Sequence, residues 1–345
     1  TAALCIALPT GGFAAIPTRP ATDLPDISLI GSFLGRSGGG QPMGFSVGEI
    51  EIAFQHYLFP SIRADVFLAI AREDNAPKIE VEEAYVTMLN LAEALSGAPD
   101  DSSFLSHWSA KLGRKKLDFG KVNPLHSEQR WTISQPTVLT TFFGDEGLAL
   151  EGGQLETPLP LPFFSQLAVG AWQSNTANAG IGLASPVLTA RWWNGHALSD
   201  TNELEWGWSA IYANPGAAAP LDRSQVLGLD ITWKSTISDW SILLFQNEIL
   251  STVYTQDGLQ LNQWGGYSFV GYRWNRQWMT GLRYDVVSTA GDTTTTTGSW
   301  SVEIARQFTE TSKVRLEYTL GTTEVPAQFL IELVFGMGPH SHVLQ

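Results

Sequence analysis

The sequence has a single cysteine, Cys5, so no disulfide within the chain can hold its fold together. No run of about 18 consecutive apolar residues is present, which argues against a transmembrane helix. Charged residues make up 16% of the chain, below the roughly 25% of ordinary soluble domains. No basic run is longer than the three residues Arg114 to Lys116, and the formal net charge is -14. A nucleic-acid partner is therefore not expected, because phosphate binding needs clustered basic side chains.

Aromatic residues, by contrast, are abundant, with 13 tryptophans, and many stretches of about ten residues alternate apolar and polar side chains. Between Val226 and Lys234, Leu227 and Ile231 fall on one face, and Asp230 and Lys234 fall on the other. Successive residues of a strand point to opposite faces, so one face requires an apolar medium while the other carries ions. This pattern predicts an all-β fold, a transmembrane antiparallel β-barrel. A tryptophan-rich soluble β-sandwich or propeller is the alternative.

Turn residues divide the chain into candidate strands, and we expect about 16 of them, with roughly 12 to 18 allowed. Residues 1–25 are expected to form an irregular leader that contains a possible signal remnant. The barrel is expected over residues 26–338, and a histidine-containing tail over residues 339–345. The candidate strands are residues 27–35, 46–57, 61–72, 77–88, 108–113, 116–122, 146–156, 165–174, 185–194, 203–213, 224–234, 239–252, 264–274, 276–287, 298–308, 312–321 and 327–337.

Two segments interrupt this rhythm of hairpins. Residues 90–107 begin with a helix-like stretch at 91–95, and residues 122–144 form a long irregular loop. Long ordered loops in compact folds are usually functional or disordered. In a barrel such a loop can lie inside the lumen, so we expect residues 122–144 to narrow it. The expected constriction residues are Asn123, His126, Arg130 and Trp131.

Assigning the apolar face of each strand to lipid turns a mixed set of ions toward the interior. The functional interpretation is a hydrated pore whose selectivity is set by its charges, and the acidic balance favours a mild preference for cations. The structural alternative is that these ions pair across strands and fill the interior. The predicted pore-lining residues are Glu49, Glu51, Arg63, Asp65, Glu80, Glu82, Arg191, Glu205, Asp230, Lys234, Arg283, Asp285, Glu303, Lys313, Arg315 and Glu317.

Histidines offer a second kind of site. His340 and His342 lie two residues apart beyond the last expected strand. Such a pair could bind zinc or copper through imidazole nitrogens, with His126 or a carboxylate completing the shell. A solvated tail without metal is the alternative.

An enzyme is not predicted, and no catalytic residue is assigned. His196, Ser199 and Asp200 supply the residue types of a Ser/His/acid arrangement. However, nothing strained or glycine-flanked marks Ser199 as a nucleophile, and the cluster falls where a loop is expected.

Residues 112–126 (LGRKKLDFGKVNPLH) resemble a recurring segment of outer-membrane barrels. The stretch is similar to porin-like proteins labelled zinc-regulated, TonB-dependent receptor-like, and more distantly to phosphate-selective porins. The resemblance covers about 50 residues and implies transport and, through the histidines, zinc. No plug domain or energy-coupling box is recognised, so an open or loop-restricted pore is expected rather than a gated receptor. The matching positions are Phe119, Gly120, Asn123, His126, Trp131, Pro136, Gly144 to Gly147, Gly152, Gly153 and Gly338 to His342.

Together these observations predict a porin-like channel of a Gram-negative outer membrane. Its partners would be outer-membrane lipid and small hydrophilic solutes or ions, and a homo-oligomer is expected by analogy with such pores. No cofactor other than zinc is expected. One alternative is a structural barrel that anchors, or belongs to, a larger envelope assembly. The other is a metal-uptake receptor-like barrel that uses His126, His340 and His342.

Overall fold

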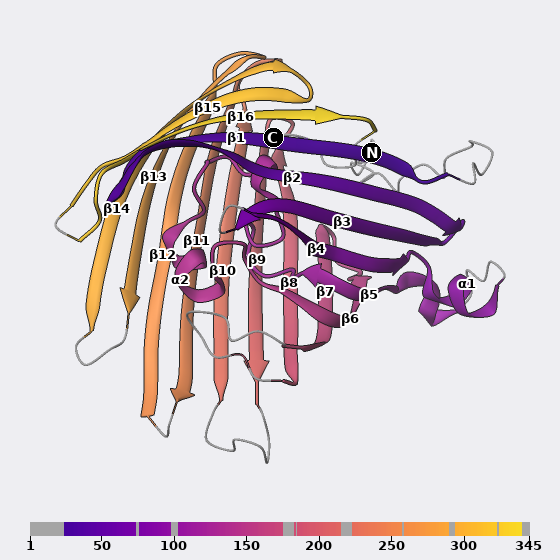
Figure 1. Ribbon diagram of the computed structural model, residues 1–345. Coiled ribbons are helices and arrows are strands. Elements are labelled where there is room, and N and C mark those ends of the chain that lie inside the picture. The colour runs from indigo at the N-terminus through magenta and orange to yellow at the C-terminus, as the bar shows by residue number, and fades with distance from the viewer. Residues whose placement is uncertain are drawn as a thin grey trace, which may run out of the picture.

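The computed structural model describes residues 24–73, 76–97, 103–174, 183, 185–214, 223–256, 259–289, 294–322 and 324–339. Within these residues, sixteen antiparallel strands form one closed barrel (Figure 1). Each strand pairs with its neighbours in chain order, and the last strand pairs with the first. The predicted fold class is confirmed. Of the expected leader, only residues 24 and 25 are among the described residues. His340 and His342 lie outside them.

The strands are β1 (Asp26–Gly38), β2 (Gln41–Phe59), β3 (Ile62–Glu73), β4 (Ala76–Met88), β5 (Ser109–Lys116), β6 (Ala149–Pro158), β7 (Phe164–Gln173), β8 (Val187–Ser199), β9 (Asn202–Ala213), β10 (Ser224–Thr236), β11 (Ile242–Gln256), β12 (Leu259–Arg273), β13 (Trp278–Thr289), β14 (Thr295–Thr309), β15 (Ser312–Thr319) and β16 (Gln328–Met337). The helices are α1 (Leu91–Ser96), η1 (Phe104–His107), η2 (Ser127–Gln129) and α2 (Thr137–Phe143). In the described residues, no helix is both long enough and apolar enough to cross a membrane.

One predicted strand is wrong. Residues 116–122 alternate apolar and polar side chains, as at Leu117, Asp118 and Phe119, but the chain leaves the sheet after Lys116. Gly120 then adopts a φ of +63°, in the left-handed region, which ends any extended run. A Cβ atom at this position would also lie 2.0 Å from a carboxylate oxygen of Glu248. The other sixteen predicted spans each overlap one observed strand.

The two faces of the wall differ in the way the alternation predicts. On β10, Leu227 is 61% exposed and points outward, whereas Asp230 is 2% exposed and points inward. Outward-facing tryptophans such as Trp208, Trp264 and Trp300 are also exposed. The soluble sandwich alternative is wrong, because the apolar rows have no second sheet against them among the described residues. The outer surface therefore suits an apolar medium.

Between β5 and β6 the chain folds into the barrel, and we call residues 117–148 the inner segment. Its two ends meet at the wall, where the Leu117 N–H donates to the Leu148 carbonyl at 2.9 Å. Lys116 and Ala149 pair directly in the sheet. Helix α2 belongs to this segment and lies inside the barrel against β12 and β13 (Figure 1). The inner segment includes the predicted loop of residues 122–144.

Candidate functional site

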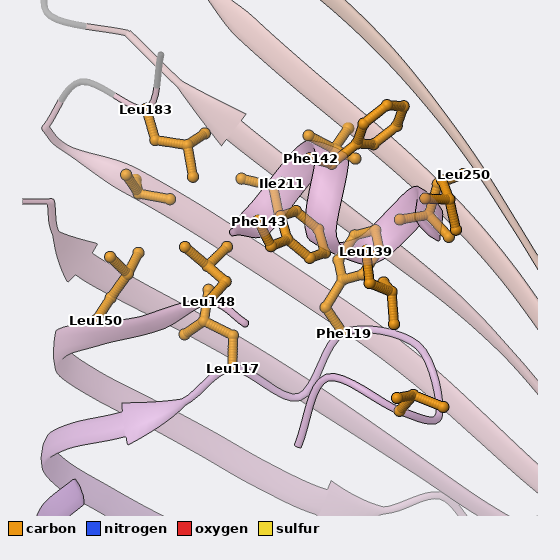
Figure 2. Close-up of a cluster of buried hydrophobic side chains, with 14 of the residues drawn as sticks. Leu117, Phe119, Leu139, Phe142, Phe143, Leu148, Leu150, Leu183, Ile211 and Leu250 are labelled. Atoms are coloured by element: carbon orange, nitrogen blue, oxygen red, sulfur yellow. The ribbon is translucent and has the colours of Figure 1, made fainter. Parts of the chain in front are cut away.

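Part of the interior is a dry, apolar cluster. Val138, Leu139, Phe142 and Phe143 of α2 are almost completely buried, and Figure 2 shows several of these side chains converging with others from the wall. Each buried side chain of this size contributes roughly 1.5–3 kcal/mol relative to exposure. Alongside the predicted hydrated interior, the barrel therefore contains a dry patch. Further residues of the cluster are Leu117, Phe119, Val122, Leu148, Leu150, Ile211, Val226, Leu244, Leu250 and Phe269.

The opposite side of the inner segment is held by buried ions of the wall. Arg315 is 1% exposed. Its Nε donates to Oε2 of Glu332 at 2.7 Å, and its Nη1 donates to the carbonyls of Arg130 at 2.8 Å and Thr132 at 3.2 Å. Lys313 donates to the carbonyl of Glu128 at 2.6 Å. These cations satisfy main-chain carbonyls that no secondary structure would pair.

A second group of wall residues fixes the approach to α2. Arg283 donates to Asp285 at 2.6 Å and to the hydroxyl of Thr132 at 2.6 Å. The other oxygen of Asp285 accepts the backbone N–H of Thr137, the first residue of α2, at 3.0 Å. A carboxylate at this position satisfies one of the unpaired donors that open a helix. The ion pair thus positions the helix as well as the loop before it.

Carboxylates on β11, β14 and β15 accept further backbone donors of the inner segment. Glu248 accepts from Val122 N–H at 2.9 Å, and Glu303 accepts from Ile133 N–H at 3.0 Å. Glu317 accepts from the backbone of Ser134 at 3.1 Å. Hydrogen bonds to charged groups contribute roughly 1.5–3 kcal/mol each. The inner segment is therefore fastened along its length.

The structure thus divides the predicted pore-lining residues by what they contact. Arg283, Asp285, Glu303, Lys313, Arg315 and Glu317 bind the inner segment. Others pair with charged neighbours: Arg63 with Asp65, Glu80 with Lys78, Glu82 with Lys116, Arg191 with Asp230, Glu205 with Lys121, and Lys234 with Glu203. Glu51 contacts His126, and Glu49 is half-buried on the same strand.

The four predicted constriction residues all lie in the inner segment. Asn123 joins its ends, donating to the Leu117 carbonyl at 2.8 Å and accepting from Leu148 N–H at 2.7 Å. The Trp131 ring lies 6.3 Å from that of Phe269, between centroids. Arg130 is half-buried in this segment, and burial, together with Arg315, lowers its pKa. His126 is buried among carboxylates.

His126 lies at the centre of an acidic cluster. Its Nδ1 is 2.6 Å from Oε2 of Glu51 and 3.4 Å from Oε2 of Glu82, while its Nε2 is 3.0 Å from Oε2 of Glu83. Burial and Lys116 oppose protonation of the ring, but the three neighbouring carboxylates outweigh them. The pKa of His126 is therefore raised well above its ordinary value.

Glu83 was missed by the sequence reasoning, and a β-bulge explains its position. In the pairing of β3 with β4, Phe67 is opposite Glu83 while Leu68 is opposite Val81, so Glu82 is the extra residue. A bulge changes the direction of side chains, and here two consecutive carboxylates point inward. The signal in the sequence was the adjacent pair itself, since strict alternation would put one carboxylate outside.

Other missed residues are the partners of predicted ones. Glu332 pairs with Arg315, and Glu248 accepts hydrogen bonds from Val122 and from the hydroxyl of Tyr267, at 2.8 Å for the latter. Both glutamates lie beside outward apolar residues on strands that were predicted. Period two would therefore have placed them inward.

A cavity of about 280 Å³ remains beside the inner segment. Lys111 bonds to Glu156 at 2.6 Å, and Arg191 makes two bonds of 3.0 Å to Asp230. Burial disfavours the charge of Asp118, but the neighbouring lysines prevail and lower its pKa. The lining thus carries charges of both signs, each held in an ion pair, among apolar side chains. It is lined by Lys111, Asp118, Gly120, Lys121, Pro124, Leu125, Glu156, Gln166, Ala168, Arg191 and Trp193.

Of the residues considered for catalysis, His196 packs on the barrel wall and Ser199 lies at a turn. The His196 ring stacks on Phe163 with centroids 4.1 Å apart. The hydroxyl of Ser199 accepts from the Asn202 amide at 2.8 Å and from the backbone of Thr201 at 3.3 Å. This is the hydrogen bonding of the turn between β8 and β9.

No protein-family model matches the sequence. An uncharacterized protein of Aquifex aeolicus (strain VF5) is 24% identical over an alignment 336 residues long. The aligned part covers 81% of this chain and 67% of the relative.

Solved structures share the whole architecture. The outer membrane channel DcaP of Acinetobacter baumannii aligns with a TM-score of 0.60 and 12% identity, covering 92% of this chain and 99% of DcaP. OmpF of Salmonella typhi, solved with daunomycin, aligns with a TM-score of 0.59 and 9% identity over 91% of this chain and 97% of OmpF. In-vitro folded OmpT of Vibrio cholerae, in its trimer form, aligns with a TM-score of 0.58 and 10% identity, covering 91% of this chain and 100% of OmpT. The chain therefore has the fold of outer-membrane β-barrel porins.

Proposed function

We propose that this protein is an outer-membrane channel of the porin type, whose lumen is narrowed by the inner segment. It passes small hydrophilic solutes or ions. The observation that carries the proposal is the pairing of an exposed apolar outer face with a charged inner wall that leaves a cavity of about 280 Å³, whose lining includes charged side chains. The apolar outer face requires hydrocarbon around the barrel, and the charged inner wall with its cavity can hold water and small solutes.

The cavity argues for small solutes and weak selectivity. Three cations and two carboxylates line it: Lys111, Lys121 and Arg191 against Asp118 and Glu156. Their charges nearly cancel, so the acidic excess of the whole chain does not reach this point. We therefore expect weaker discrimination between K⁺ and Cl⁻ than the net charge alone suggests.

The test is single-channel conductance in planar bilayers, with wild type compared to a variant that lacks the inner segment. Because Leu117 and Leu148 are hydrogen-bonded neighbours, residues 118–147 can be replaced by Asn-Gly, which closes a two-residue hairpin. We expect small steps for the wild type and steps several-fold larger for the variant. The reversal potential in a KCl gradient measures the selectivity of each.

Equal step sizes in the two proteins would refute the narrowing role of the inner segment. No steps from folded, inserted protein of either kind would refute the channel. Folding of both is checked by the β-sheet circular dichroism signal and by the heat-dependent shift in gel migration that intact barrels give.

A structural barrel is the second candidate. It is favoured by the apolar cluster around α2 and by the many bonds that fasten the inner segment. In this case the wild type is silent while the Asn-Gly variant conducts.

The proposal also covers the oligomeric state of the protein and the barrel subfamily that it resembles. One of the structurally similar proteins, OmpT, was solved in a trimer form, and we propose a homo-oligomer here, to be measured by light scattering in detergent. The likeness to zinc-regulated or phosphate-selective barrels remains a prediction. A metal-uptake receptor would rest on His126, His340 and His342, of which the last two lie outside the described residues.

A further inference from the structure

The surroundings of His126 have the features of a site for a divalent metal ion. One ligand atom from each of Glu51, Glu82 and His126 lies within 4.8 Å of the other two. The common point is Nδ1 of His126, which faces Oε2 of both glutamates. Two carboxylates and one imidazole are a ligand set that zinc and related first-row ions take.

The residues that contact His126 and Glu82 from outside this set support the same interpretation. Nε2 of His126 is 3.0 Å from Oε2 of Glu83. A metal-bound histidine usually hydrogen-bonds a carboxylate through its other nitrogen, which fixes the ring. Lys116 bonds to Oε1 of Glu82 at 2.5 Å, leaving Oε2 turned toward His126. The ring of Phe67 lies 5.2 Å from the imidazole, between centroids.

An independent observation is that one oxygen of the Glu51 carboxylate, Oε1, lacks a donor among the described residues. Its side chain is 4% exposed, and its Oε1 accepts no hydrogen bond from the described residues. Oε2 of Glu82 is buried without a hydrogen bond as well. A buried carboxylate oxygen with no donor is costly, and a bound cation would satisfy it.

The charges give the same result. Three carboxylates surround one imidazole, and Lys116 bonds directly to one of them, so one negative charge stays in excess even when the ring is protonated. Buried charges in proteins are paired or coordinate metals. The excess negative charge therefore calls for a positive occupant.

We propose that Glu51, Glu82 and His126 bind one Zn²⁺ ion inside the barrel, with Glu83 orienting the histidine. The ion joins β2 and β4 of the wall to the inner segment. Zinc is preferred over Ca²⁺ and Mg²⁺, because those ions favour sites made of oxygen ligands alone. The inference is new relative to the channel proposal and does not depend on it.

The experiment uses the full chain, purified in detergent and stripped of metal with a chelator. Titration with Zn²⁺ by calorimetry is expected to give one ion per chain, with Ca²⁺ giving no comparable binding. Glu51→Gln keeps the shape of the side chain and removes its charge, and we expect affinity to fall at least about 100-fold. Glu83→Gln should weaken binding by about 10–100-fold. Cobalt absorption spectra report whether the nitrogen ligand is lost in His126→Ala.

Two control variants locate the site. His56→Ala removes a histidine that alternation places on the outer face of β2, the strand that carries Glu51, and should leave zinc affinity unchanged. The double variant His340→Ala/His342→Ala should also leave it unchanged. If zinc binding is lost only in the double variant, the site is in the tail and the proposal fails.

Two other results would overturn the proposal. One is equal affinity in wild type and Glu51→Gln, and the other is no zinc binding by folded wild type, in which case a protonated His126 alone holds the cluster. Glu51→Gln remains informative if His126→Ala does not fold. Because calorimetry needs no ion current, zinc binding and conduction succeed or fail separately.

Discussion

At the scale of single residues, Arg315 shows why the interior charges are structural. Its guanidinium reaches both Glu332 on the next strand and three carbonyls of the inner segment. Removing one partner of a buried ion pair leaves the other charge uncompensated. The same loss would leave main-chain carbonyls unpaired.

We therefore expect Arg315→Ala to lower the free energy of unfolding by about 3–5 kcal/mol. Denaturant-induced unfolding in detergent, followed by tryptophan fluorescence, measures it. Lys234→Ala is the matched control, because Lys234 pairs with Glu203 at 3.3 Å while both side chains are largely exposed. That pair should contribute about 1 kcal/mol or less. Equal losses in the two variants would contradict a special role for Arg315.

Sequence alone placed these residues on the correct face but not with the correct partners. Alternation assigned Arg315 and Glu317 inward, because their neighbours Val314 and Leu316 are apolar. The partners come from a loop about 185 residues earlier in the chain, and no local pattern encodes that contact. Glu83 needed the bulge of β4, which depends on pairing with β3.

At the scale of elements, α2 is the part that the sequence least revealed. It has only seven residues, too few for an independent helix, so packing must hold it. Inward-facing apolar residues on the wall provide that packing, among them Val226, Leu244 and Leu250. Each stands next to an outward apolar residue in the sequence, as in Val226-Leu227 and Ile249-Leu250. Such pairs indicate a strand that is apolar on both faces, and hence a dry patch inside.

The packing of α2 predicts the effect of Phe142→Ala. Phe142 is 0% exposed, and truncating a buried phenylalanine costs about 3–5 kcal/mol. A local loss of about 3 kcal/mol raises the open fraction of the helix roughly 100-fold. We expect hydrogen exchange of the α2 amides to accelerate by that factor.

Thr141→Ala, at a half-buried position of the same helix, is the control and should change exchange little. Similar rates for the two variants would mean that the apolar cluster does not hold α2 in place.

At the scale of the whole molecule, closure of the sheet decides what surrounds it. No strand edge is left open among the described residues, since β16 pairs with β1 over ten positions. No sequence motif encodes this closure. It was predicted because an open sheet edge in hydrocarbon would leave backbone N–H and C=O groups without hydrogen bonds. The sequence could not fix the number of strands, since the inner segment imitates one more strand at its start.

The proposed contact of the outer face with hydrocarbon predicts the behaviour of Ile249→Arg. Ile249 lies at the middle of β11 and is 58% exposed on the outer face. An arginine near the bilayer midplane costs a barrel about 2–4 kcal/mol. We expect a reduced yield of folding into lipid vesicles and a normal yield in detergent micelles. Thr201→Arg, in the turn between β8 and β9, should fold equally in both; the same result for Ile249→Arg would refute lipid contact.

The inner segment starts and finishes at adjacent positions of the wall, where Leu117 and Leu148 share a hydrogen bond. Its length is consequently independent of the circumference of the barrel. Because the wall closes at Lys116 and Ala149, the segment can be lengthened or shortened while the register of every strand is kept. The frame and its insert are in this sense separate parts of one chain.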